Sequence, residues 1–400
     1  MNAAMSKLSV AVRKPAVKFV GKPTPVTYIG PGRAKEVGRL LGLLGAGKAL
    51  VITGSYLYQS GQLEGLLDGI RKAGVEYTVF CGVQPDPTFA VADDLAKACA
   101  GCHAVVAVGG GSVIDAAKAA AAAAANHTRS EALVGVMKVR CHPLPLIAVP
   151  TTAGAGSETT LAAVISDPVT HVKRQLLDPK LVPMFAILDP EMTVSLPAHT
   201  TAYTAMDALT HALEAYVSRY ADAETDRQAR MAIRLIVRYL PQVRENPADL
   251  EGREGLLTAA FFAGMAFTRT YVGYVHAFAH AIGGKFGVSH GLANGVLLPH
   301  IMRYYLPVCS GRFAELGRML KLGMPGDTDE IKARRFVKLL YKLKRQMEIP
   351  TRLEQFPASA IEEVIDLAFQ ECHGTYPVPR YFSRAHARKL MEAVCAQETS

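Results

Sequence analysis

The chain has 400 residues, of which half are hydrophobic and a fifth are charged, so it is neither disordered nor low-complexity over any large part. Because domains commonly contain about 100–200 residues, this length predicts two of them. The 44 basic and 35 acidic residues give a net charge of +9, which is compatible with a phosphate-bearing ligand, nucleic acid or an anionic membrane but does not choose among them. No apolar run approaches the about 18 residues of a transmembrane helix, and we expect no membrane partner.

The cysteines and the N-terminal residues bear on the compartment. Seven widely spaced cysteines, an odd number, argue against a disulfide framework. Residues 1–20 carry Lys7, Arg13, Lys14 and Lys18 but no apolar core of signal-peptide type. We therefore expect a cytoplasmic protein, with an organellar presequence as the alternative.

The first half of the chain alternates short apolar strands with helical patterns. The expected strands are 26–30, 49–53, 75–80, 104–108 and 144–149. The expected helices end near 44, span 62–73, end near 99 and start at 112. Strands that are apolar on both sides and separated by helices predict a parallel sheet covered on both faces, in a Rossmann-like α/β domain.

The second half has a different pattern. After residue 190 we find no strong strand pattern, and helices are expected at 198–220, 223–240, 252–267, 273–282, 293–305 and 333–347. We therefore expect an α/β domain over residues 1–193 and an all-helical domain over residues 194–400.

Two turns at the ends of expected strands are candidate cofactor contacts. Turn 109–112 (Gly-Gly-Gly-Ser) joins a strand to a helix, where glycines let backbone N–H groups approach a phosphate and the helix N-terminus favours an anion. It lacks the third glycine of the G-x-G-x-x-G fingerprint. The alternative is a tight turn capped by Ser112, with Asp115 and Lys118 as a surface pair. Loop 150–158, rich in Thr, Gly and Ser, follows the next strand and suits the sugar and phosphate edges of a cofactor, or is simply flexible.

The helical half holds a possible metal site. Asp207 and His211 are four residues apart, as are His276 and His280, so each pair lies on one face of a helix. His290 follows a Gly-Gly break. Imidazoles and one carboxylate are ligands for a divalent transition metal. The alternative is a set of hydrogen-bonded core histidines, and we assign no site role to His127, His142, His171, His199 and His373.

Two other patterns suggest different functions. Residues 99–103 read Cys-Ala-Gly-Cys-His, the attachment string of c-type haem, but they precede the strand that leads into turn 109–112, and haem there would block that turn. Residues 332–345 carry seven basic and no acidic side chains, with apolar residues at helical spacing. A surface helix with one buried stripe is our interpretation, and nucleic-acid binding is the alternative.

With these residues in view, the chain resembles the iron-containing (group III) alcohol dehydrogenases over roughly residues 24–390. The resemblance rests on Gly-Gly-Gly-Ser-Val-Ile-Asp-Ala-Ala-Lys at 109–118, Pro-Thr-Thr-Ala-Gly at 150–154, the order of the aspartate and histidines, and the segment 290–300. It implies a dinucleotide-binding α/β domain before a helical metal-binding and catalytic domain, the two-domain plan of dehydroquinate synthase.

The resemblance also implies roles for single residues. The expected metal ligands are Asp207, His211, His276 and His290, and His280 is the expected catalytic residue beside the substrate. The residues expected at the cofactor are Gly54, Gly110, Gly111, Ser112, Asp115, Thr151, Thr152 and Lys173. The implied activity is that of an NAD(P)-linked alcohol dehydrogenase or aldehyde or ketone reductase, with hydride transfer between nicotinamide and a metal-bound alkoxide or carbonyl.

Cofactor choice, metal and substrate are less determined. NAD-preferring members often end the second strand with Val-Thr-Asp, whereas residues 51–54 here read Val-Ile-Thr-Gly, so NADP is admissible and favoured. Near the C-terminus, where the family often has Asn-Pro-Arg, residues 376–380 read Tyr-Pro-Val-Pro-Arg, so the sequence does not determine which alcohol or aldehyde is the substrate.

Fe²⁺ is the expected metal and Zn²⁺ the alternative. We expect a homo-oligomer, a dimer, with a small-molecule substrate and no nucleic-acid partner. A metal lyase of the dehydroquinate-synthase type is disfavoured, because its metal set normally uses Glu.

Overall fold

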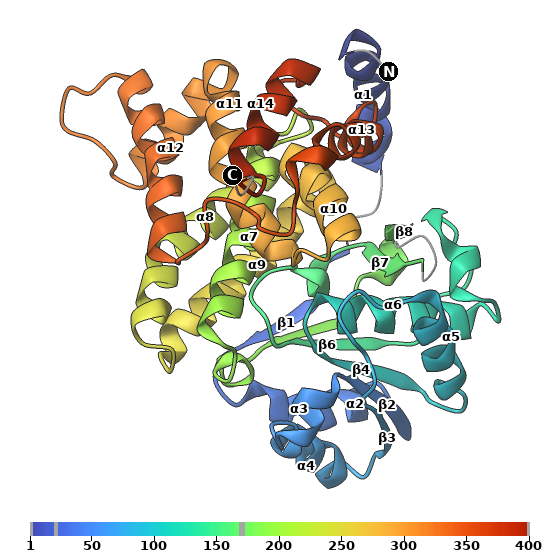
Figure 1. Cartoon of the computed structure of the whole chain (residues 1–400). Coiled ribbons are helices and arrows are strands. Elements are labelled where there is room, and N and C mark those ends of the chain that lie inside the picture. Colours follow the sequence, from blue (N-terminus) through green and yellow to red (C-terminus); the bar gives the residue numbers. More distant parts are fainter. Residues whose placement is uncertain (1–2, 20–22, 168–172, 398–400) are drawn as a thin grey trace. The chain divides into compact units, whose positions relative to one another are not determined.

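A computed structural model of the chain describes residues 3–19, 23–167 and 173–397 (Figure 1). It contains two compact units. The sheet unit comprises Val20–Leu196 and Ala248–Thr268, and the helical unit comprises Met1–Phe19, Pro197–Pro247 and Arg269–Ser400. The expected division at 193/194 lies close to one of these boundaries, but it differs at two helices. Helix α1 (Ala3–Phe19) groups with the helical unit and most of α9 (Leu250–Thr270) with the sheet unit, because a helix joins the core on which its buried face packs.

The sheet unit is built on a six-stranded sheet with the order β1-β9-β6-β4-β2-β3, in which all pairs are parallel. Its strands are β1 (Val26–Ile29), β2 (Lys48–Thr53), β3 (Glu76–Phe80), β4 (Ala104–Gly109), β6 (Leu146–Pro150) and β9 (Phe185–Leu188). The expected parallel α/β fold is confirmed. From β2 the chain continues to β3 on one side, and from β4 it continues to β6 on the other, so the strand order reverses between the neighbours β2 and β4.

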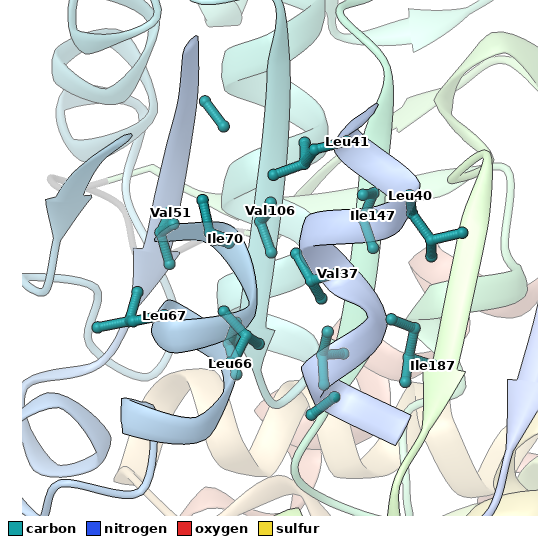
Figure 2. Close-up of a cluster of buried hydrophobic side chains, with 14 of the residues drawn as sticks. Val37, Leu40, Leu41, Val51, Leu66, Leu67, Ile70, Val106, Ile147 and Ile187 are labelled. Carbon is teal, nitrogen blue, oxygen red and sulfur yellow. The ribbon is translucent and has the colours of Figure 1, made fainter. Parts of the chain in front are cut away.

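Helices cover both faces of this sheet. They are α2 (Val37–Leu43), α4 (Glu64–Lys72), α5 (Phe89–Ala98) and α6 (Gly111–Ala125), whereas α3 (Ser55–Gln59) follows β2 and has no buried residue. Alternate residues of one strand face opposite layers: Val106 packs with α2 and α4, whereas Val105 packs with α5 and α6. Figure 2 shows the first layer, where Val37, Leu40 and Ile70 lie over Val51 and Ile147. Burial on both faces explains why the central strands β4 and β6 carry no polar side chain.

Some strands were not predicted. Strand β9 lies between β1 and β6 and is not among the expected strands. A second sheet of the order β5-β8-β7 contains β5 (Gly135–Val136), β7 (Ala162–Ser166) and β8 (Lys173–Leu177), with β7 and β8 antiparallel. Strands of two to five residues give too few positions for a periodic pattern.

The helical unit matches its expected class. Its helices after α1 are α7 (Ala198–Val217), α8 (Ala223–Glu245), α10 (Tyr274–Phe286), α11 (His290–Met319), α12 (Asp329–Gln346), α13 (Ile361–Cys372) and α14 (Arg384–Val394). Phe336, Leu340 and Leu343 are buried along α12, which confirms that the basic segment is a surface helix with one buried stripe. None of the described helices is long and apolar enough to cross a membrane.

Candidate functional site

Three of the sheet unit's candidate cofactor positions follow neighbouring strands. Gly54 follows β2, residues 109–112 end β4, and Thr151 follows β6. The register pairs Thr53 with Val108 and Gly109 with Pro150, so the three turns meet at one edge of the sheet. This edge contains the point where the strand order reverses, which is where open parallel sheets bind their ligands.

The glycines of turn 109–112 allow close packing. Gly111 is the first residue of α6, and the Cβ of any other side chain there would lie 2.7 Å from the Cβ of Ala155. A Cβ at Gly110 would lie 3.1 Å from the Oγ1 atom of Thr152. Gly110 has φ −75° and no residue of the turn has a positive φ, so close approach to loop 150–158, not unusual backbone geometry, requires glycine here.

The alternative of a surface pair of Asp115 and Lys118 is wrong, because both side chains reach into the protein. Asp115 accepts hydrogen bonds from the Ser157 hydroxyl and from the Val164 N–H at 2.9 Å. Lys118, 1 % exposed, donates to the oxygens of Thr160 and Ala162 at 2.8–2.9 Å. Burial lowers the pKa of Lys118 to about 8, against the opposing charge of Asp115. These side chains of α6 therefore hold the segment that follows loop 150–158.

Helix α9 supports the other side of that loop. Gly156 adopts φ +60°, and a Cβ there would lie 2.6 Å from the carbonyl oxygen of Ala260. Thr268 accepts a hydrogen bond from the Leu161 N–H at 3.2 Å. The loop is therefore packed between α6 and α9, which excludes the alternative of a merely flexible loop.

Lys173 is connected to turn 109–112 by its contact with Asp86. Its Nζ atom is 2.9 Å from the carboxylate of Asp86, whose backbone N–H donates to the Ser112 hydroxyl at 3.3 Å. The Lys173 side chain is 24 % exposed, so its charge is accessible beside the turn. Of the histidines given no role, His171 lies outside the described residues.

The string Cys-Ala-Gly-Cys-His at 99–103 forms no exposed attachment site. Cys99 and Cys102 are buried, and burial raises the pKa of both thiols. The Nδ1 atom of His103 accepts the Lys48 N–H at 3.2 Å. The string therefore packs a helix end against β2 and β4.

The helical unit brings the expected metal ligands together. Asp207 and His211 lie on α7, His276 and His280 on α10, and His290 begins α11. The Oδ1 atom of Asp207 is 3.4 Å from His290 Nε2, 3.6 Å from His276 Nε2 and 3.9 Å from His211 Nδ1.

The most compact part of this cluster has three members. Asp207, His276 and His290 each offer one ligand atom, and these atoms lie within 4.8 Å of one another. His211 is not part of that group, and its ring stacks on His276 with the centroids 4.4 Å apart.

The protonation of His276 tests whether the cluster fits a cation. The Nδ1 atom of His276 lies 2.7 Å from the Glu214 carboxylate, which can only accept, so in the neutral ring Nδ1 carries the proton and Nε2 has the lone pair. Nε2 is buried and has no hydrogen-bond partner among the described residues. A lone pair facing the Asp207 carboxylate is unfavourable unless a positive charge lies there, so these residues fit a metal ion.

The pKa values point the same way. Burial favours the neutral ring of His276, but the carboxylates of Asp207 and Glu214 outweigh burial and raise its pKa to about 9, so a positive charge on Nε2, a proton or a metal ion, is favoured beside Asp207. Burial would raise the pKa of Asp207, yet the charges of His211 and His290 hold it well below its usual value. The cluster therefore stabilises a positive charge beside a carboxylate that stays ionised.

Three further residues of this region were missed in the sequence. Glu214 also accepts the N–H groups of Gly273 and Val275, both at 2.7 Å. It stands seven residues after Asp207 on α7, and that i+7 spacing was the available signal. Asn294, four residues after His290, donates to Asp207 Oδ1 at 2.7 Å. Glu371 lies 2.7 Å from His280 Nδ1 and carries no local signal.

Comparison with known proteins agrees with this geometry. The family model for iron-containing alcohol dehydrogenase matches residues 23–190, and the C-terminal model of the Fe-containing alcohol dehydrogenase family matches residues 201–395. The chain is 39% identical over 330 residues to a NAD-dependent methanol dehydrogenase from Bacillus methanolicus, which covers 82% of this chain and 86% of that protein.

Two further comparisons support the same grouping. The chain is 38% identical over 333 residues to a 1,3-propanediol dehydrogenase from Klebsiella pneumoniae, covering 82% of this chain and 86% of that protein. The crystal structure of a 1,3-propanediol oxidoreductase matches with a TM-score of 0.89 and 34% identity, covering 94% of this chain and 99% of that chain. The chain therefore belongs to the iron-containing alcohol dehydrogenase family, and it is a metal-dependent alcohol dehydrogenase.

Proposed function

We propose that this dehydrogenase holds Fe²⁺, with Zn²⁺ as the alternative, through Asp207, His211, His276 and His290. The observation that carries the proposal is the unpaired Nε2 atom of His276, which faces Asp207 Oδ1 at 3.6 Å. Nitrogen and oxygen ligands suit iron(II) and zinc alike. When bound, such an ion supplies a Lewis acid for an alcohol or carbonyl oxygen, and a nicotinamide supplies the hydride chemistry.

Three of the proposed ligands, Asp207, His276 and His290, have a supporting polar side chain. Glu214 keeps the proton of His276 on Nδ1, so Nε2 faces the cluster. Asn294 holds the carboxylate of Asp207 and lies 3.1 Å from His290 Nε2. We assign to His280 the proton relay at the substrate. Its ring stacks on that of His290, with the centroids 5.2 Å apart.

We assign the cofactor to the edge of the sheet formed by Gly54, turn 109–112 and loop 150–158. Backbone N–H groups at the start of α6 would bind the pyrophosphate, Thr151 and Thr152 would line the cofactor, and Lys173 would reach its ribose. Asp115, which the sequence placed among the cofactor contacts, would act by holding the segment after loop 150–158.

Cofactor choice follows from the end of β2. Gly54 there carries no carboxylate to repel a 2′-phosphate, so we expect NADP(H) to be used at least comparably to NAD(H). The relative from Bacillus methanolicus is NAD-dependent by name. We further propose a cytoplasmic homodimer, with the functional division near residue 193 and a small alcohol or aldehyde as substrate.

The test combines two measurements on the purified protein. Elemental analysis should find about one iron or zinc per chain. Oxidation of NADPH and NADH across a panel of aldehydes and ketones should then identify the substrate and the preferred cofactor. A protein with no bound metal whose turnover is insensitive to added Fe²⁺ or Zn²⁺ would refute the proposed site.

A further inference from the structure

His280 is held by a residue that lies outside the family's motifs. Its ring lies between His290, at 5.2 Å between centroids, and Glu371 on α13. The Nδ1 atom of His280 is 2.7 Å from Glu371 Oε1. A carboxylate at this distance accepts the Nδ1 proton and leaves Nε2 as the nitrogen available to a substrate.

Tyr376 fixes Glu371 in turn. Its hydroxyl donates to the same oxygen, Oε1, that accepts from His280. Tyr376 is 4 % exposed, and burial together with the charge of Glu371 raises its pKa well above the usual value, so the hydroxyl keeps its proton and remains a donor. Two donors converging on one carboxylate oxygen restrict the rotation of the Glu371 side chain.

The segment that carries Tyr376 is itself held through its backbone. Arg219 donates from its backbone N–H to the carbonyl of Pro377 at 2.7 Å. Its guanidinium donates to the carbonyls of Val378 at 2.9 Å and Pro379 at 3.3 Å. One arginine therefore spans three consecutive carbonyls of the segment that replaces the expected Asn-Pro-Arg.

Helix α1 completes these contacts. Ser9 donates to the carbonyl of Gly374 at 3.0 Å, and Lys14 donates to the carbonyl of Arg219 at 2.6 Å. Tyr220 donates to the carbonyl of Val10 at 2.7 Å. Helix α1 lies before residue 23, where the family match begins, so it is a part of this chain that the family motifs do not describe.

We propose that Glu371 and Tyr376 are positioning residues that hold the ring of His280 in one tautomer and one orientation, and that Arg219 and helix α1 hold the segment carrying Tyr376. The proposal rests on the proposed role of His280. The orientation of His280 would then depend on contacts that begin at helix α1.

The test compares substitutions that keep or remove the acceptor. Glu371→Gln keeps an oxygen for both donors without the charge, whereas Glu371→Leu has similar bulk and no acceptor. We expect Glu371→Leu to lower kcat by about 10- to 100-fold, since polar groups that orient a functional histidine commonly contribute that much. Glu371→Gln should retain kcat within about 5-fold, and metal content and cofactor Kd should stay unchanged in both.

A spectroscopic readout separates orientation from general damage. In the zinc-loaded protein labelled with ¹⁵N-histidine, the His280 resonances, assigned with His280→Ala, should report the Nδ1–H tautomer in the wild type and in Glu371→Gln. Glu371→Leu should give a mixture of tautomers. An unchanged tautomer and unchanged kcat in Glu371→Leu would overturn the proposal. A wild-type kcat in His280→Ala would instead overturn the proposed role of His280, so the two failures are distinguishable.

Coupling tests the contribution of Arg219. Tyr376→Phe and Arg219→Ala should each lower kcat by about 3- to 10-fold, and their combination should cost little more than either alone, because both act on one segment. Arg230→Ala, which changes an exposed arginine of α8, is the matched control and should leave kcat unchanged. Fully additive losses of kcat, or an unchanged kcat in Tyr376→Phe, would contradict the proposal that Arg219 acts on His280 through Tyr376 and Glu371. Tyr376→Phe keeps the ring that is buried, so this arm remains informative if Glu371→Leu does not fold.

Discussion

The candidate cofactor region and the candidate metal cluster differ in the groups that form them. The edge of the sheet unit offers backbone and small side chains: a Cβ at Gly111 would collide with loop 150–158, and a Cβ at Gly110 would make a tight contact with it. The helical unit offers charged and aromatic side chains converging on one oxygen, Asp207 Oδ1. The first region should therefore be sensitive to added atoms and the second to removed ones. Substitutions that add or delete single groups can test this difference directly.

Removing a ligand should have the largest effect. We expect His276→Ala to lose its metal and to lower kcat/KM by on the order of 10³-fold, since a bound cation contributes several kcal/mol to the transition state. Elemental analysis and steady-state kinetics measure both quantities. His199→Ala, an exposed histidine on the same helix as Asp207, is the control. Stoichiometric metal and full activity in His276→Ala would show that the ligand assignment is wrong.

Adding atoms to the turn should come next. In Gly111→Val the new Cβ would lie 2.7 Å from that of Ala155, so turn 109–112 or loop 150–158 must move. Overpacking of this kind costs about 1–3 kcal/mol, which corresponds to a roughly 5- to 150-fold rise in cofactor Kd. Metal content should not change. Gly42→Val is the matched control, because nothing lies within 4 Å of a Cβ at Gly42. A fluorescence titration with NADPH that gave equal Kd values for wild type and Gly111→Val would contradict the cofactor assignment.

The same contrast explains what the sequence could predict. The i,i+4 pairs on α7 and α10 and the strand-turn-helix around residue 110 are local patterns, and the structure places each as expected. The alternative of a surface pair of Asp115 and Lys118 failed because the i,i+3 spacing shows that two residues share a helix face but not whether that face is exposed. The alanine run that follows them marks a helix buried on most sides, and such a helix buries its charges as well.

The remaining features depend on contacts between distant parts of the chain. Strand β9 has four residues and is recognisable as a strand only from its place between β1 and β6. Glu371 reaches His280 across 91 positions, and Ser9 reaches Gly374 across 365. No periodic pattern links residues at such separations, so these supports become visible only in the folded chain.

A support of the metal cluster should show an intermediate effect. Glu214 accepts three N–H groups, from His276, Gly273 and Val275, and a glutamine amide would place donors against at least one of them. We expect Glu214→Gln to weaken metal binding by about 10- to 100-fold. Competition with a coloured chelator measures this. Glu245→Gln, exposed at the end of α8, is the control. Unchanged metal affinity in Glu214→Gln would mean that its carboxylate serves only to join α7 and α10.

The smallest expected effect concerns cofactor choice at Gly54, where a substitution can act through added volume and through added charge. A Cβ there would lie 3.3 Å from the carbonyl oxygen of Val83, so any side chain requires a slight local shift. Gly54→Asp adds a carboxylate as well, which would accept a bond from the 2′-hydroxyl of NAD and repel the 2′-phosphate of NADP. In partly screened solvent we expect about 1–2 kcal/mol, or a roughly 5- to 30-fold shift of the kcat/KM ratio toward NAD.

Gly54→Asn separates charge from volume in that experiment, because it has nearly the same size and no charge. Paired kinetics with NADPH and NADH at one ionic strength should show the shift in Gly54→Asp and little change of the ratio in Gly54→Asn. Raising the salt concentration should reduce the shift, since the repulsion is screened over about 10 Å at 0.1 M ionic strength. An equal shift in both variants would assign the effect to the contact with Val83. A wild type strictly specific for NAD would place the discrimination elsewhere, and Ser55 and Tyr56, the first residues of α3, are then the next positions to substitute.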